Sequence, residues 1–106
     1  MTPNERSNTG DHGVSTLSER EGAVGWRFDL SLPCEDGEEP RTVTLVLSWV
    51  DYEYWSHGIA SPCRVAEAVV RALLAADPKR ELPDEFDAST ARRWVRDLDQ
   101  RVREML

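Results

Sequence analysis

Two residue types near the middle of the chain have the chemistry of a nucleophilic site. Cys63 comes two positions after Ser61, a residue type that begins helices, and His57 lies six positions before the cysteine, across a turn that contains glycine. The unpaired N–H groups and the dipole of a helix N-terminus stabilise a thiolate, and a nearby imidazole can activate it. The pair therefore predicts, as one hypothesis, a Cys63/His57-dependent enzyme or a thiol-based redox-responsive protein.

A structural interpretation explains the same two residues more simply. Free cysteines are mostly small buried side chains, and a histidine in a turn is most often a surface residue. No spacing in the chain places a third catalytic residue, a phosphate-binding glycine loop, a nucleophile elbow or a zinc-protease motif. We therefore expect no catalytic residues and favour a domain without enzymatic activity, with the Cys63/His57 enzyme as the alternative.

A metal site would have to combine Cys34, Cys63, His57 and His12. Structural zinc sites usually contain ligand pairs two to four residues apart, and these four residues form no such pair. The sequence therefore predicts no metal and no cofactor. Both cysteines are expected to be reduced thiols inside a cell.

An aromatic cluster lies just before the cysteine. Trp49, Tyr52, Tyr54 and Trp55 fall within seven residues, with His57 just beyond them. Such a cluster can anchor a protein interface or line a ligand pocket, or it can simply fill the junction between a strand and a helix. Strand alternation places Trp49 inward, helical spacing places Tyr52 and Trp55 on one face, and Tyr54 is then the expected exposed contact.

The C-terminal segment is rich in arginine. Arg92, Arg96 and Arg103 fall on one outer strip by helical spacing, where they could bind an acidic partner. The simpler interpretation is a solvated face with local ion pairs to neighbouring carboxylates. The candidate interaction residues of the whole chain are Tyr52, Tyr54, Trp55, His57, Arg92 and Arg96.

The overall charge restricts the class of partner. The formal net charge is −7, and four of the acidic residues lie close together at Glu35, Asp36, Glu38 and Glu39. An acidic chain repels nucleic acid and anionic membrane surfaces, so a nucleic-acid partner is not expected. The acidic run can instead attract a basic protein partner.

The elements that position these residues follow from the hydrophobic period. Residues 24–32 and 41–50 alternate apolar and polar side chains and predict an antiparallel β-hairpin. A short helical turn is expected at 51–57, begun by Asp51. Apolar side chains three and four residues apart predict two main helices, about 62–77 and 89–105, packed against the hairpin. The predicted fold class is therefore α+β.

The domain organisation is predicted to be simple. The chain has 106 residues, enough for one domain, which we place at residues 22–106. Residues 1–21 carry almost no large apolar side chains and are expected to form a flexible N-terminal tail. No apolar run has the length of a signal sequence or a membrane span, so we expect a soluble cytoplasmic protein without membrane contact.

The edges of a two-stranded sheet need cover. A lone hairpin is only marginally stable in water, and pairing of its edges across a twofold axis or with a partner would complete the sheet. We therefore expect a small intracellular protein-interaction or regulatory domain, dimeric or completed by a partner. A small-ligand-binding domain that uses the aromatic turn 49–57 is a further alternative.

Overall fold

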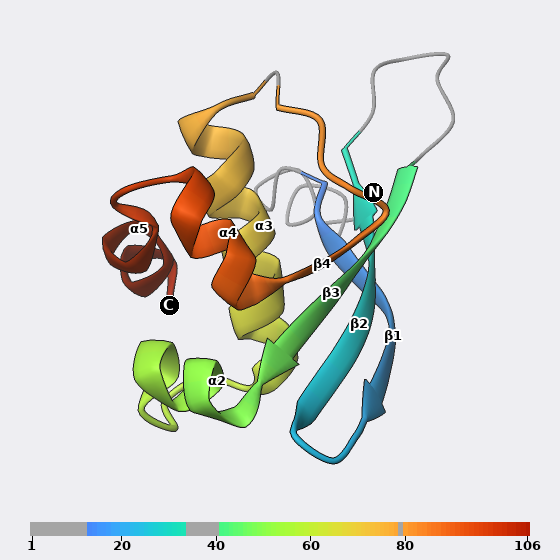
Figure 1. Cartoon of the computed structure of the whole chain (residues 1–106), viewed down its shortest axis with the longest axis vertical. Coiled ribbons are helices and arrows are strands. Elements are labelled where there is room, and N and C mark those ends of the chain that lie inside the picture. The colour runs from blue at the N-terminus through green and yellow to red at the C-terminus, as the bar shows by residue number, and fades with distance from the viewer. Residues whose placement is uncertain (1–12, 34–40, 79) are drawn as a thin grey trace, which may run out of the picture.

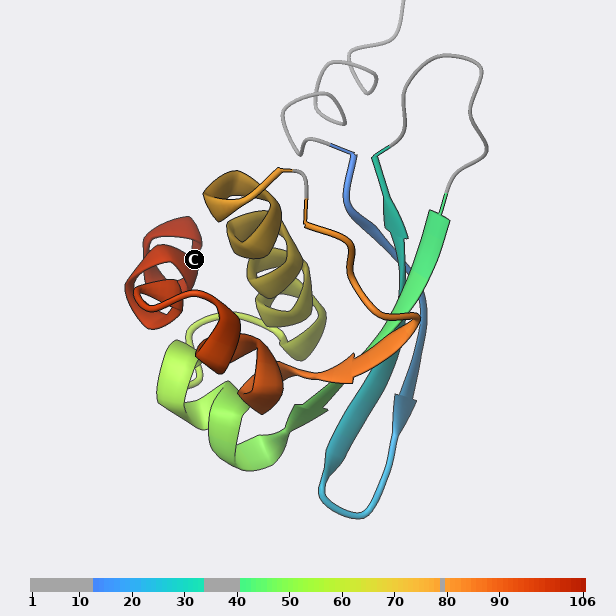
Figure 2. The same cartoon turned by 45° about the horizontal axis from the view of Figure 1, so that its top comes forward.

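The computed structural model describes residues 13–33, 41–78 and 80–106. Within these ranges, four helices lie on one side of a four-stranded mixed sheet, with α5 packed on the other helices and not on the sheet (Figures 1 and 2). This arrangement confirms the α+β class that the hydrophobic period predicts.

The sheet is a three-stranded antiparallel meander with a short fourth strand. β2 and β3 pair along their whole length, from Gly25 opposite Ser48 to Leu32 opposite Arg41, which confirms the predicted hairpin. The fourth strand, β4, runs parallel to β3. The connection between the two strands contains two helices, as a parallel crossover requires. In spatial order the strands are β1 (Ser15–Glu21), β2 (Gly25–Leu32), β3 (Arg41–Ser48) and β4 (Glu85–Asp87).

The structure differs from the sequence prediction at residues 15–21, which form β1 instead of belonging to a flexible tail. Their side chains are mostly exposed, so the strand lacks the apolar alternation by which a strand is predicted. Its order comes from backbone pairing with β2 and from the carboxylate of Glu67, which accepts hydrogen bonds from the N–H and hydroxyl of Thr16 at 3.1 and 2.6 Å. Residues 1–12 of the predicted tail lie outside the described residues.

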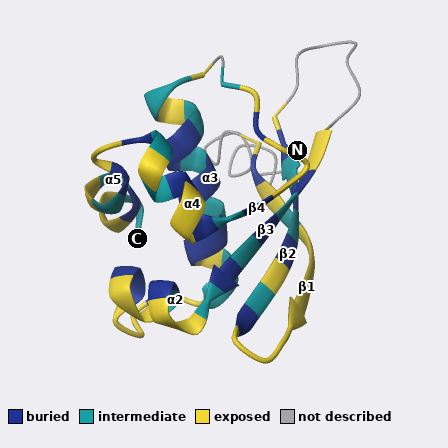
Figure 3. Cartoon of the chain, in the orientation of Figure 1, coloured by how far each residue is buried: buried dark blue, intermediate teal, exposed yellow. Residues whose placement is uncertain are grey.

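The core lies between the sheet and α3 (Pro62–Ala76), as Figure 3 shows. Ser61 precedes this helix and Pro62 occupies its first turn, where the missing N–H costs nothing. The helix predicted at about 62–77 is confirmed, and it is buried on most of its circumference. Its buried side chains are Val65, Ala66, Ala68, Val69, Val70, Ala72 and Leu73, and they face Phe28, Leu30, Val43, Leu45 and Leu47 of the sheet.

The predicted helix at 89–105 is two helices. α4 (Ala88–Trp94) begins at Asp87, whose side chain accepts a hydrogen bond from the Ser89 N–H at 2.8 Å. Val95 then adopts extended backbone angles, and α5 (Leu98–Met105) follows after a turn. Val95 and Leu98, on the two sides of the break, are both buried.

The loop before α4 contains β4, which the sequence did not predict. Phe86, the middle residue of the strand, is buried, as is Leu82 before it, and both attach this segment to the core. A strand of three residues is too short to show a period of two.

The helical turn predicted at 51–57 is longer and begins earlier. α2 (Trp49–Ser56) begins after Ser48, whose hydroxyl oxygen accepts a hydrogen bond from the Asp51 N–H at 3.1 Å, and it ends at His57 in the left-handed conformation. The strand alternation therefore stops one residue before Trp49. The prediction that Trp49 faces inward is wrong, because helical geometry directs it outward, where it is 45% exposed.

Gly25 is needed where β2 starts beside the end of β3. A Cβ atom at this position would lie 2.1 Å from the carbonyl oxygen of Leu47 and 2.6 Å from the Cα of Ser48, both backbone atoms. We expect Gly25→Ala to lower the free energy of unfolding by about 3 kcal/mol, because backbone must move to admit the methyl group. Gly22→Ala is the matched control: its Cβ would meet only the Gly25 oxygen, at 3.8 Å, and the expected change is within about 0.5 kcal/mol. Urea unfolding measures both, and equal effects would contradict this account of Gly25.

Candidate functional site

The outer face of α2 differs from that of an ordinary surface helix. Its inner face buries Trp55 together with Asp51 and Ser56, which are the buried polar residues of the described chain. Its outer face carries Trp49, Val50 and Tyr54, all exposed, along with the exposed Glu53. A surface helix normally exposes its polar side to water and buries its apolar side. The outer face of α2 is therefore an apolar surface in contact with water.

Two neighbouring residues extend this apolar face. The N–H of Trp49 donates to the carbonyl of Val24 at 2.9 Å, which places the β1–β2 turn at the start of the helix, and Ile59 follows the end of the helix. Among the described residues, six large apolar side chains are exposed, and only Leu17 on β1 lies elsewhere. We call the other five the α2 surface: Val24 (71% exposed), Trp49 (45%), Val50 (77%), Tyr54 (42%) and Ile59 (83%).

Hydrogen bonds satisfy the polar groups on the inner face of α2. The buried hydroxyl of Ser56 accepts from the N–H of Ala60 at 3.0 Å and lies 3.2 Å from its carbonyl oxygen. The Tyr52 hydroxyl donates to the same carbonyl at 2.6 Å, and its ring makes an edge contact with Trp26 at 5.3 Å between centroids. Tyr52 is thus half-buried and structural, rather than a free contact residue.

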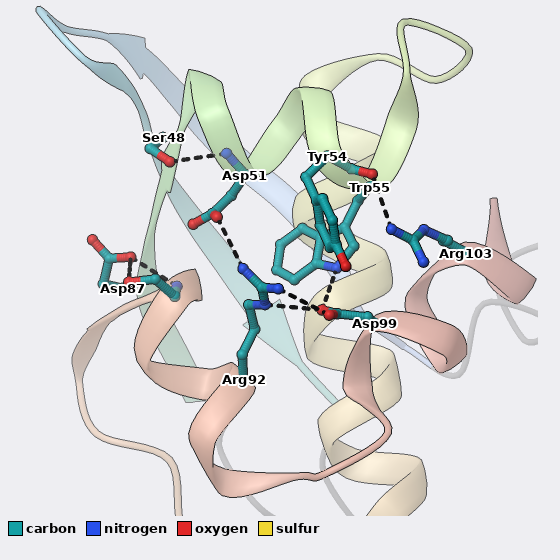
Figure 4. A network of polar contacts seen from close by, with 9 residues as sticks. Ser48, Asp51, Tyr54, Trp55, Asp87, Arg92, Asp99 and Arg103 are labelled. Atoms are coloured by element: carbon teal, nitrogen blue, oxygen red, sulfur yellow. Dashed lines mark hydrogen bonds and ion pairs between the residues drawn. The ribbon is translucent and has the colours of Figure 1, made fainter.

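Arg92 joins α2 to the two C-terminal helices (Figure 4). From α4, its Nε and Nη2 atoms each donate to the carboxylate of Asp99 on α5 at 2.9 Å, and Nη1 lies 3.5 Å from Asp51 on α2. The indole N–H of the buried Trp55 donates to the same Asp99 carboxylate at 2.8 Å. A planar guanidinium held by two bonds to one carboxylate fixes orientation as well as distance. Arg92 therefore orients three helices relative to one another.

The two carboxylates beside Arg92 have opposite pKa shifts. Burial raises the pKa of Asp51, and the charge of Arg92 only partly opposes it. Burial also acts to raise the pKa of Asp99, but the hydrogen bonds from Arg92 and Trp55 outweigh it and hold that pKa below its usual value. The hydrogen bond to Asp99 raises the pKa of Arg92. Asp99 is thus the main counter-ion of Arg92, whereas the charge of Asp51 is costly to bury.

Two guanidinium groups hold Tyr54. Those of Arg92 and Arg103 lie 4.7 and 4.5 Å from the centre of its ring, and Arg103 also donates to the Tyr54 carbonyl oxygen at 3.3 Å (Figure 4). Cation–π contacts of this kind restrict an exposed ring to one orientation. Arg96, predicted on the same strip, is exposed in the connection between α4 and α5 and is not part of this group.

The structure separates the roles of Cys63 and His57. Cys63 is half-buried in the first turn of α3, and its sulfur lies 3.5 Å from the hydroxyl of Ser61. His57 is exposed and ends α2 with a φ of 51°. No hydrogen bond joins these two described residues, and His57 acts as the helix terminator through its N–H, which donates to the Glu53 carbonyl at 2.9 Å.

The edges of the sheet carry features that oppose pairing with another strand. β1 has a register shift between Thr16 and Ser18, and it ends in Glu19, Arg20 and Glu21. β4 at the other edge has only three residues. Bulges, charges and short edge strands are the devices by which proteins avoid edge-to-edge association. These features weigh against the expectation that a sheet edge forms the contact.

Two pockets in the described part of the chain lie away from the outer face of α2 or at its margin. One, of about 310 Å³, lies at the β1–β2 turn and is lined by residues that include Val24, Trp26 and Val46. The other, of about 280 Å³, lies between α3, α5 and the strand ends, and Leu74 and Met105 line it. Neither is lined by residues 49–57, where the sequence places its ligand-binding alternative.

Metal-ligand groups, membrane-spanning helices and similarity to known proteins assign no activity to this chain. The described residues contain no group of three or more His, Cys, Asp or Glu side chains placed to hold a metal ion, and His12 and Cys34 lie outside them. Within the same ranges, no helix combines the length and the apolar character that crossing a membrane requires. Neither protein-family models nor curated proteins nor solved structures gave a match to this chain.

The opposite shifts at Asp99 and Asp51 predict opposite responses to neutral replacements. A carboxyl group with a lowered pKa in the folded state stabilises it above the ordinary pKa, and this stabilisation is lost as the pH falls through the folded value. Asp99→Asn should therefore lower the free energy of unfolding by about 1–3 kcal/mol at pH 7, with a smaller loss below about pH 4. A raised pKa means that ionisation opposes folding, so Asp51→Asn should change stability by less than about 1 kcal/mol at pH 7.

Urea unfolding at pH 7 and in acid measures both variants. An Asp51→Asn loss as large as that of Asp99→Asn would contradict the assignment of Asp99 as the main counter-ion.

Proposed function

We propose that this chain is a protein-interaction domain without catalytic activity and that the α2 surface is its contact site. The observation that supports the proposal is the outer face of α2, where Trp49, Val50 and Tyr54 are exposed to water although Asp51 and Ser56 of the same helix are buried. Contiguous exposed apolar side chains rimmed by polar groups are typical of binding surfaces.

The rigidity of this surface also favours binding. Trp49 makes an edge contact with Trp26 at 6.2 Å between centroids, and two arginines restrict Tyr54. Tryptophan, tyrosine and arginine are the residue types that contribute most to interface energies. Side chains that are already ordered lose little conformational entropy when a partner covers them.

The alternatives draw less support from the same side chains. A Cys63 nucleophile would need a base within hydrogen-bond reach, and the sulfur contacts the Ser61 hydroxyl instead. A ligand site at the aromatic turn would need a concave surface, whereas Trp49, Val50 and Tyr54 project from the outer face of a helix.

Val50→Asp tests the proposal, with Leu17→Asp as the matched control. Both replace an exposed aliphatic side chain by a carboxylate, one on the α2 surface and one on β1, so both variants should fold. We expect the tagged wild-type chain to retain a binding protein from its native cells that excess untagged chain displaces. Val50→Asp should reduce this binding at least tenfold, and Leu17→Asp should leave it unchanged.

Quantitative capture of this kind measures the binding, and circular dichroism checks that each variant is folded. Binding that survives Val50→Asp, or that is lost with Leu17→Asp instead, would contradict the proposed surface. A second copy of the chain counts as a binding protein in this experiment.

A further inference from the structure

The pocket at the β1–β2 turn is a second candidate site, and we infer that it binds a small organic carboxylate with an apolar tail. Its volume of about 310 Å³ is at the small end of the range for ligand sites, roughly 300–1,000 Å³. Val24 is the residue that it shares with the α2 surface, and its charged side chains come from the strands. The inference therefore goes beyond the function proposed above and does not depend on it.

Three side chains of the pocket lie in one row on the face of the sheet opposite to the helices (Figure 2). Strand pairing places Arg20 of β1 opposite Arg27 of β2, and Arg27 opposite Val46 of β3. Alternation from the buried Phe28 and Leu45 puts all three side chains on this outer face. Two guanidinium groups and one aliphatic side chain therefore lie side by side across the sheet, next to the turn.

The two arginines are arranged as an acceptor site for an anion. Side chains directly opposite each other on neighbouring strands have Cβ atoms about 5 Å apart, and like charges at that spacing repel. Arg27 donates from Nη2 to Glu85 at 2.6 Å, which leaves other N–H groups of its guanidinium for a further acceptor. Arg20 makes no hydrogen bond or ion pair with a described residue, and its charge acts on Asp29 at longer range. A carboxylate between the two guanidinium groups would relieve their repulsion and accept hydrogen bonds from both.

The carboxylates on this face of the described strands already have partners. Asp29 accepts hydrogen bonds from the hydroxyls of Ser18 and Thr44, each at 2.7 Å. The other pairs are Glu85 with Arg27 and Asp87 with Ser89. Glu21 also lines the pocket, but it follows Arg20 directly, so its side chain leaves the strand on the opposite face. Arg20 is therefore the charged group on this face whose partner has to come from outside the described chain.

The apolar part of the site comes from Val46 and the turn. Val46 is the one apolar side chain that the described strands β2, β3 and β4 place on the outer face. Val24, which is 71% exposed, lines the same pocket. A ligand can thus place a charged head between the two guanidinium groups and a short apolar tail against these valines. A head without a tail, or a tail without a head, would use only half of the site.

The net charge of −7 is compatible with an anionic ligand at this pocket. At physiological ionic strength the Debye length is about 8 Å, so distant charges are largely screened. The charges within that distance decide, and at the pocket they are those of the two arginines and their partners.

The test is an NMR titration of the whole chain with hexanoate. We expect saturable binding with a dissociation constant on the order of 1 mM, and amide shifts centred on residues 20–27 and 46. Hexanamide has the same tail without the charge, and inorganic phosphate has charge without a tail. Each should bind at least about fivefold more weakly than hexanoate.

Arg20→Gln, with Arg64→Gln as its matched control, tests the placement of the site. Both variants remove one exposed arginine and the same net charge, but Arg64 is on α3, outside the pocket. Arg20→Gln should weaken hexanoate binding at least about fivefold, and Arg64→Gln should leave it unchanged. Thermal melts check that each variant is folded.

Two results with the wild-type chain alone would overturn the inference, so the test does not depend on the folding of a variant. One is hexanoate binding that shows no saturation up to about 20 mM, and the other is hexanamide that binds as tightly as hexanoate. Equal losses in Arg20→Gln and Arg64→Gln would also overturn it, because the effect would then be one of net charge. Capture of a partner through Val50 is a separate measurement, so either proposal can fail while the other stands.

Discussion

The hydrogen bonds of Arg92 to Asp99 are the interaction on which the candidate site depends. They form where α4 and α5 meet, and the same carboxylate receives the indole N–H of Trp55 from α2. Residues of three different helices are thereby joined by one ionic group. α2 is also attached by the burial of Trp55 and, at its two ends, through Ser48 and Ala60.

This attachment explains why α2 has its apolar side chains outside. Asp51 lies toward Arg92, and Ser56 lies toward the backbone of Ala60, so the polar groups of the helix are satisfied inside the molecule. The positions left for the outer face are those of Trp49, Val50 and Tyr54. A helix turned the other way would bury these side chains, but it would leave Arg92 and Asp99 without Trp55 and the Asp51 carboxylate. The hydrogen bonds of Trp55 and Ser56 therefore favour this orientation of α2, at a cost in exposed apolar area.

The parts of the fold with a strong period were predictable from the sequence, and the parts that depend on distant contacts were not. β2, β3 and α3 each bury a regular stripe, so alternation and helical spacing identified them. β1 has exposed side chains and is ordered by its neighbour and by Glu67, which no local pattern reveals. The apolar residues on both sides of the break at Val95 keep helical spacing, so the sequence does not indicate the break.

The candidate site was predictable only in part. Tyr54 was expected to be exposed and is, whereas Trp49 was misplaced because the strand predicted at 41–50 ends two residues earlier, at Ser48. Arg92 was identified as a surface contact, but its role in joining helices depends on Asp51 and Asp99, which are 41 and 7 residues away in the chain. The one available clue was the short spacing of Asp99 from Arg92, and it does not distinguish this pair from ordinary surface ion pairs.

The central claim is that α2 is held with an apolar outer face, which we propose as the contact surface for a partner. Amide and methyl NMR spectra recorded with and without a binding protein test it most directly, because Val24, Val50 and Ile59 report from the α2 surface and Leu17 reports from the other exposed apolar site. The account predicts helical shifts for residues 49–56 in both spectra and changes on binding that are confined to the three α2-surface residues and their neighbours. Changes centred on Leu17 and β1, or the absence of helical shifts at 49–56, would contradict it.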